Sequence, residues 1–222
     1  MNNIKKDEIN YICSLGISCH SANIIKRNNL KKCSYPFDWI YSDFEVIEDA
    51  LDDNFKKFLD KDNFIDHLHG NPIQCGHKLY SNVMFNHSNP RIESVYQYYQ
   101  RCITRFNNLL NQEGKKLFVM LIFNEQFNHI DIEDSLNKLN EKFKNKTNNY
   151  KILCINHHHN QPENNYTIKE IDNINLLQLY TKSDSTGATF NDNNDNDYLD
   201  TILLSLYDFN ILDKNFNDNY DL

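Results

Sequence analysis

The sequence predicts an α/β fold, a three-layer domain with a mostly parallel central sheet flanked by helices. Several short runs are continuously apolar, such as 117–123, which is typical of strands buried on both faces of a parallel sheet. Longer stretches with apolar residues at helical spacing alternate with these runs. The length of 222 residues suits one domain that buries roughly 70% of its extended surface. We therefore expect a single α/β domain over residues 1–210, followed by a polar tail or linker at 211–222.

The first strand and the first helix are joined by a glycine. Residues 9–15 form a short apolar run that predicts a buried strand ending before Gly16. Residues 18–28 have helical spacing, and the Ser18 hydroxyl can cap this helix by accepting a hydrogen bond from a free backbone amide. A strand, a tight turn and a helix in this order are the unit from which parallel sheets are built.

The remaining elements follow from the same two periodicities. Helices are expected at 43–59, 93–111, 131–145 and 198–206, and central strands at 116–123, 150–155 and 174–180. The segment 34–40 is aromatic and contains a proline, so we expect an extended, buried loop. Residues 67–87 are irregular and suit a small hairpin or lid, and the asparagine-rich tract 191–197 is expected to be a loop.

Charge and composition exclude several classes of protein. The 23 Lys and Arg against 31 Asp and Glu give a net charge of −8, which disfavours a partner that is a nucleic acid. The apolar runs are shorter than the about 20 residues that a membrane-spanning helix needs, and the first ten residues are polar. We therefore expect a soluble cytoplasmic protein with no membrane partner.

The cysteines and histidines do not predict a metal site. The 6 cysteines form no CxxC pair, which in an intracellular chain indicates free, mostly buried thiols. Three consecutive histidines at 157–159 lack partners at zinc-finger spacing. We expect no bound metal.

The chemistry is expected at the turn after the first strand. In parallel α/β folds, ligands bind beyond the carboxyl ends of the strands, where the free amides of the next helix face the site. Cys19 would lie in the first helical turn, and the positive end of the helix dipole would lower the pKa of its thiol and favour the nucleophilic thiolate. The alternative is that Cys19 is a small core residue under the sheet.

A thiolate nucleophile needs a histidine and a group that orients it. His87 is the best candidate because it ends an aromatic, strand-like run, whereas His20 is expected to be a solvated surface residue. Asp38 lies between Phe37 and Trp39, where a carboxylate either makes structural hydrogen bonds or orients a base.

Arg101 and Arg105 lie four residues apart on one predicted helix, so their side chains are expected to share a face. One interpretation is a solvated basic edge. The other is a pair of guanidinium groups that hold a phosphate or carboxylate of a ligand.

These segments together carry a family resemblance. The pattern is Ser14-Leu15-Gly16-x-x-Cys19, Ser34-x-Pro36-Phe37-Asp38-Trp39, Phe85-x-His87 and Tyr98-x-x-Arg101-x-x-x-Arg105-Phe106. Over roughly 9–205 the chain resembles a family catalogued as papain-like cysteine peptidases, found in bacteria and large DNA viruses. The resemblance implies a papain-like or Rossmann-like domain in which Cys19 and His87 follow the order of the papain dyad. An Asn or Asp partner after the histidine is not evident.

A looser similarity links the strand-Gly-x-x-Cys-helix unit to coenzyme A-dependent acetyltransferases of sugar and capsule pathways. It implies acetyl-CoA as co-substrate, bound by Ser14, Gly16, Ser18, Arg101 and Arg105, and a sugar or nucleotide sugar as partner. The asparagine-rich composition is similar to that of giant-virus proteins. That similarity implies a place in the host cytoplasm and fusion to further glycan-modifying domains.

Three functional hypotheses follow. The first is an acetyltransferase that moves an acetyl group from acetyl-CoA to the amino group of a nucleotide-linked amino sugar. The alternative is a papain-like cysteine peptidase or thiol hydrolase with a Cys19/His87 dyad. The third is a module that binds a glycan or a nucleotide sugar, is attached to a larger enzyme, and uses Cys19 only structurally. Both enzymatic hypotheses require Cys19 and His87 to line one pocket.

Overall fold

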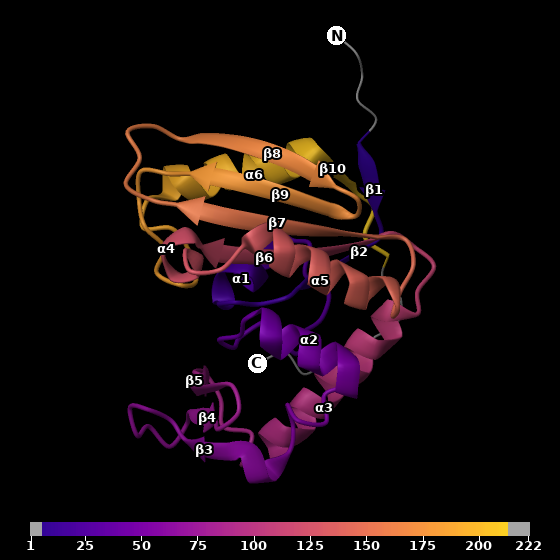
Figure 1. Ribbon diagram of the computed structural model, residues 1–222, viewed down its shortest axis with the longest axis vertical. Coiled ribbons are helices and arrows are strands. Elements are labelled where there is room, and N and C mark those ends of the chain that lie inside the picture. Colours follow the sequence, from indigo (N-terminus) through magenta and orange to yellow (C-terminus); the bar gives the residue numbers. More distant parts are fainter. Residues whose placement is uncertain (1–5, 213–222) are drawn as a thin grey trace.

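The computed structural model describes residues 6–212 and contains a central sheet of five strands (Figure 1). The strand order is β2 (Tyr11–Ser14), β6 (Lys116–Phe123), β7 (Tyr150–His158), β9 (Ile174–Tyr180) and β8 (Asn165–Ile171). The first four strands run parallel, and β8 pairs antiparallel with β9 at the edge. The prediction of a layered α/β domain is confirmed, although the sheet is mixed rather than purely parallel.

Helices cover both faces of this sheet. One face carries α1 (Cys19–Arg27) and α6 (Asn193–Leu206), and the other carries α2 (Phe44–Asp53), α3 (Glu93–Leu110) and α5 (Ile132–Lys144). Side chains alternate along β6 because successive residues of a strand point to opposite faces. Phe118 and Met120 therefore pack with α2, α3 and α5, whereas Val119 and Leu121 pack with α1 and α6.

Two smaller sheets and two short helices complete the fold. An antiparallel sheet of β3 (Phe64–Asp66), β4 (Cys75–His77) and β5 (Ser81–Phe85) follows the 3-10 helix η1 (Lys61–Asn63). Figure 1 shows this sheet on the far side of α2 from the central sheet. The strands β1 (Asp7–Ile9) and β10 (Tyr207–Phe209) pair in parallel, and α4 (Asn124–Phe127) follows β6.

Several predicted boundaries are corrected by local backbone geometry. The helix expected over 43–59 ends at Asp53, because Asn54 and Phe55 adopt φ angles of 57° and 61°. The tract 191–197, expected to be a loop, instead begins α6, because the Asp192 side chain caps the helix by accepting from the Asn194 amide. The strand β8 was missed because most of its residues are exposed and no apolar run marks it.

The predicted end of the domain lies close to the end of the described chain. Residues 213–222 of the expected tail lie outside the described residues. Within residues 6–212, no helix is long and apolar enough to cross a membrane.

Candidate functional site

At one edge of the sheet, two neighbouring strands are followed by helices that lie on opposite faces of the sheet. Strand β2 leads into α1 on one face, and β6 leads through α4 into α5 on the other. Crevices at such switch points are where open α/β sheets bind ligands. A cavity of about 290 Å³ lies here, and it is lined by residues that follow β2 and β6, by the end of β7 and by the loop after β9. The members of this lining are Ile17, Ser18, Tyr41, Phe123, Asn124, Glu125, Gln126, His157, His159, Asp184, Ser185, Thr186 and Gly187.

A strained turn brings α1 to the rim of this cavity. Gly16 and Ile17 have φ angles of 79° and 73°, a region that a β-branched residue rarely adopts. A Cβ on Gly16 would lie 2.6 Å from Ser42 Oγ and 2.7 Å from the Phe37 carbonyl oxygen, so only glycine fits. The Ile17 amide donates to Ser42 Oγ at 2.9 Å, which holds the turn in place. Strain of this kind is typical of functional sites.

The two serines of the predicted site have different positions. Ser18 caps α1 as expected, because its Oγ accepts from the His20 amide at 3.4 Å, and it also lines the cavity. Ser14 is fully buried, and its Oγ accepts from the Gly16 amide at 3.0 Å. Ser14 therefore shapes the turn, while Ser18 faces the cavity.

Cys19 begins α1, and its side chain is nearly covered. Its exposed fraction is 9%, and burial raises the pKa of its thiol to about 11, despite a lowering contribution from its own backbone amide. The expectation of a lowered pKa is wrong, because desolvation of the thiolate outweighs the field of the helix start. At neutral pH the thiol is protonated and needs a base to become a nucleophile.

His87 lies two residues after the end of β5. The neighbouring Ser88 Oγ lies 3.0 Å from the hydroxyl of Tyr99, a residue of α3. Burial raises the pKa of Tyr99. Within residues 6–212, no hydrogen bond joins His87 to Cys19, and the imidazole is exposed.

A groove connects the two segments that carry Cys19 and His87. Its volume is about 650 Å³, and its lining runs from Ile17, two residues before Cys19, to Asn86, the residue before His87. The groove shares Ile17, Tyr41 and Gln126 with the cavity, so the two spaces adjoin each other.

Asp38 ties together the buried loop of residues 34–40. Its exposed fraction is 1%, its carboxylate pairs with Lys31, and it accepts a hydrogen bond from the Tyr35 amide at 2.9 Å. This geometry matches the interpretation in which the Asp38 carboxylate makes structural hydrogen bonds, rather than the one in which it orients a base. The negative charge of Asp38 also raises the pKa of Cys19.

The two arginines do not form the expected pair on one open face. Arg105 is 3% exposed, and its Nη1 donates to the Ser34 carbonyl oxygen at 3.2 Å, so its guanidinium is used inside the fold. Arg101 is half-buried, and its Nε has no hydrogen-bond partner in the described part of the chain. Helical spacing correctly placed both residues on α3 but did not reveal that a loop from residues 34–40 covers Arg105.

His20 is fully buried, so the expectation of a solvated surface residue is wrong. Its Nδ1 lies 2.9 Å from Ser185 Oγ, and its ring packs edge-on against Phe190 with centroids 4.5 Å apart. Burial lowers the pKa of His20 to about 3. The loop that covers it is far away in the sequence, and no local pattern could have indicated this contact.

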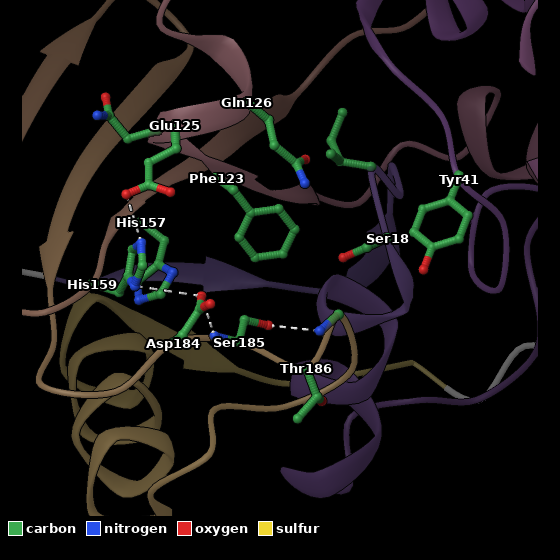
Figure 2. Close-up of a pocket in the computed structure, with 13 residues that line it drawn as sticks. Ser18, Tyr41, Phe123, Glu125, Gln126, His157, His159, Asp184, Ser185 and Thr186 are labelled. Carbon is green, nitrogen blue, oxygen red and sulfur yellow. Dashed lines mark hydrogen bonds and ion pairs between the residues drawn. The ribbon is translucent and has the colours of Figure 1, made fainter.

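The histidine run contributes two residues to the cavity (Figure 2). His159 Nε2 lies 2.8 Å from Glu125 Oε1, and its Nδ1 lies 3.8 Å from Asp184 Oδ1, so one imidazole is held between two carboxylates. His157 is 2% exposed, and burial lowers its pKa to about 4. Among residues 6–212, no group of His, Cys, Asp and Glu is arranged to hold a metal ion. The rule that ligands bind at the carboxyl ends of strands could have singled out this run.

Comparison with known proteins gives one match. Residues 10–160 match a family described as "Putative papain-like cysteine peptidase (DUF1796)". The matched range extends from the start of the central sheet to just beyond β7, and it includes Cys19, Asp38 and His87. No curated protein and no solved structure matches the chain.

Proposed function

We propose that this chain, which belongs to the family of papain-like cysteine peptidases DUF1796, is a thiol-dependent hydrolase that cleaves peptide or related acyl bonds with Cys19 as nucleophile. The observation that carries this proposal is the groove, whose lining joins the turn before Cys19 to the residue before His87. Neither Cys19 nor His87 is itself among the residues that line this groove, so a substrate bound there must reach Cys19 past Ile17 and His87 past Asn86. This order, a cysteine at a helix start and a later histidine, is also the one that the family resemblance implies.

The reaction requires that the Cys19 thiol lose its proton, and the burial of this thiol makes the proton transfer unfavourable. Because the pKa of Cys19 is raised to about 11, His87 must take the thiol proton as the sulfur attacks the substrate carbonyl carbon. The carbonyl oxygen becomes an oxyanion, which free amides at the start of α1 can stabilise. Collapse of this intermediate expels the amine, which takes the proton from His87, and water then hydrolyses the thioester. The raised pKa implies that substrate binding must bring the imidazole to the sulfur.

Two observations favour hydrolysis over acetyl transfer. Arg105, one of the two arginines assigned to the phosphates of CoA, is buried against Ser34. The cavity is lined by two carboxylates, Glu125 and Asp184, and by no Lys or Arg, so it suits a polyanionic cofactor poorly. The sugar and nucleotide-sugar partners belong to the acetyltransferase hypothesis and stay predictions.

The proposal is tested by labelling Cys19 with a peptidyl chloromethyl ketone and locating the adduct by peptide mass spectrometry. We expect one adduct at Cys19, and we expect Cys19→Ala to lose both the adduct and peptide cleavage. The matched control is Cys33→Ala, which removes another buried thiol of similar exposure, 6% against 9%. This control should keep both activities.

Three results would contradict the proposal. Undiminished cleavage by Cys19→Ala would remove Cys19 as the nucleophile. Saturable binding of CoA by calorimetry, together with acetylation of an amino sugar, would support the acetyltransferase instead. If the wild type neither cleaves nor acetylates but still binds glycans, the chain is a binding module.

A further inference from the structure

The cavity beside the groove presents negative charge at its mouth. Of its 13 lining residues, Glu125 and Asp184 are acidic and none is Lys or Arg. Their side chains are 74% and 56% exposed, so both remain accessible to a ligand while they hold His159 between them. Charges of this arrangement favour a cation and disfavour a phosphate or carboxylate.

A buried imidazole adds a hydrogen-bond acceptor deeper in the cavity. The hydroxyl of Thr181 has one proton, which it donates to the Ser183 carbonyl oxygen at 2.8 Å. At its 2.7 Å contact with Thr181 Oγ1, His157 Nε2 must therefore be the donor. Because burial keeps His157 neutral at pH 7, its Nδ1 carries a lone pair and no proton. Within residues 6–212 no group donates a hydrogen bond to this Nδ1. A bound ligand with an N–H group could supply that donor.

The remaining lining completes a site for a group with several N–H donors. Ser18 is 1% exposed, lines the cavity and presents its Oγ there (Figure 2). The Phe123 ring lies in the same view between His157 and Gln126, where its face can contact a cation. A planar guanidinium or an ammonium satisfies carboxylates, a ring nitrogen and an aromatic face together.

We infer that this cavity binds the cationic side chain of an arginine or lysine in a peptide substrate. The peptide part of this inference rests on the proposed function, and the cation part rests on the cavity alone. Because cavity and groove share Ile17, Tyr41 and Gln126, a peptide lying in the groove can place one side chain in the cavity. That side chain would anchor the substrate beside the start of α1, next to Cys19.

The test compares two ligands that differ in charge and hardly in shape. Nα-acetyl-arginine methylamide carries a guanidinium, and Nα-acetyl-citrulline methylamide carries a neutral urea group in its place. Binding is measured by calorimetry or by NMR titration of the wild-type protein. We expect the arginine ligand to bind at least about 10-fold more tightly. Equal binding of the two, or binding of neither, would overturn the inference.

Variants that replace carboxylates with neutral amides test whether the preference for the arginine ligand arises in this cavity. The double variant Glu125→Gln/Asp184→Asn should lose it, and Glu163→Gln, which removes an exposed carboxylate that does not line the cavity, should keep it. A preference that survives in the double variant would place the cation elsewhere and contradict the inference.

The two proposals can fail separately. Because binding is measured without turnover, an inactive wild type would contradict the hydrolase and leave the cation site intact. Conversely, if peptides with leucine or glutamate beside the scissile bond are cleaved as well as peptides with arginine, the hydrolase stands and the assignment of the substrate class falls.

Discussion

Two segments of this chain carry the same family pattern, and the fold uses them in opposite ways. The turn from Ser14 to Cys19 opens onto a cavity at the carboxyl edge of the sheet. The loop of residues 34–40 is buried, and its Asp38 bonds to Lys31 and to the backbone of Tyr35. The comparison shows that a charged residue in a family motif can stabilise the loop that shapes a site without taking part in the reaction.

The largest expected effect concerns the buried loop. Asp38→Asn removes the charge that pairs with Lys31, and breaking a buried ion pair costs roughly 3–5 kcal/mol. Urea denaturation followed by circular dichroism should therefore show a large loss in the free energy of unfolding. The control Asp66→Asn breaks an exposed pair with Arg91 and should cost less than about 1 kcal/mol. A neutral effect of Asp38→Asn would mean that this loop does not depend on its carboxylate.

The turn at the cavity should be nearly as sensitive, for a steric reason. Gly16→Ala places a Cβ against Ser42 Oγ and Phe37 O at a positive φ, which should lower the free energy of unfolding by roughly 2 kcal/mol or more. Gly70→Ala is the matched control, since Gly70 also has a positive φ but no atom within 4 Å of the added Cβ. Thermal denaturation should separate the two variants, because Gly70→Ala incurs only the backbone strain. Equal losses would mean that the close approach at Gly16 is unimportant.

A third expected effect is a pH dependence that arises from the two buried histidines, small near pH 6.5 and larger as the pH falls. Burial lowers the pKa of His20 to about 3 and of His157 to about 4, from an ordinary value near 6.5. Below pH 6.5 these two histidines become protonated in the unfolded chain, whereas in the folded chain they stay neutral down to their lowered pKa values. Stability is therefore complete well above pH 6.5 and falls as the pH drops toward 4, by about 1.4 kcal/mol per pH unit for each histidine and about 2.7 kcal/mol per pH unit for the two together.

Denaturation at pH 7, 6 and 5 measures this slope. His20→Gln should reduce it to roughly half, because His157 remains, and the exposed His129→Gln should leave it unchanged. A His20→Gln slope as steep as that of the wild type would show that His20 does not contribute to it.

The comparison also shows which parts of the site can be predicted from residues that lie close together in the sequence. The cap at Ser18, the glycine turn and the strand at 116–123 were predicted because each depends on residues close in sequence. The Cys19 pKa was predicted in the wrong direction, because the helix start is a local property whereas burial depends on the whole fold. The contact between His20 and Ser185 joins residues 165 positions apart, and no periodicity encodes it.

Hydrophobic periodicity and short-range backbone preferences were enough to determine an α/β domain, its central strands and a strand-turn-helix unit with Cys19 at the start of its helix. The order of the strands, the burial of Arg105 and His20, and the cavity lined by residues from several separate segments were decided by tertiary packing alone. The physical reason is that a side chain's solvent exposure, and with it the pKa and the partners of a charged group, depends on segments that meet only when the chain is folded.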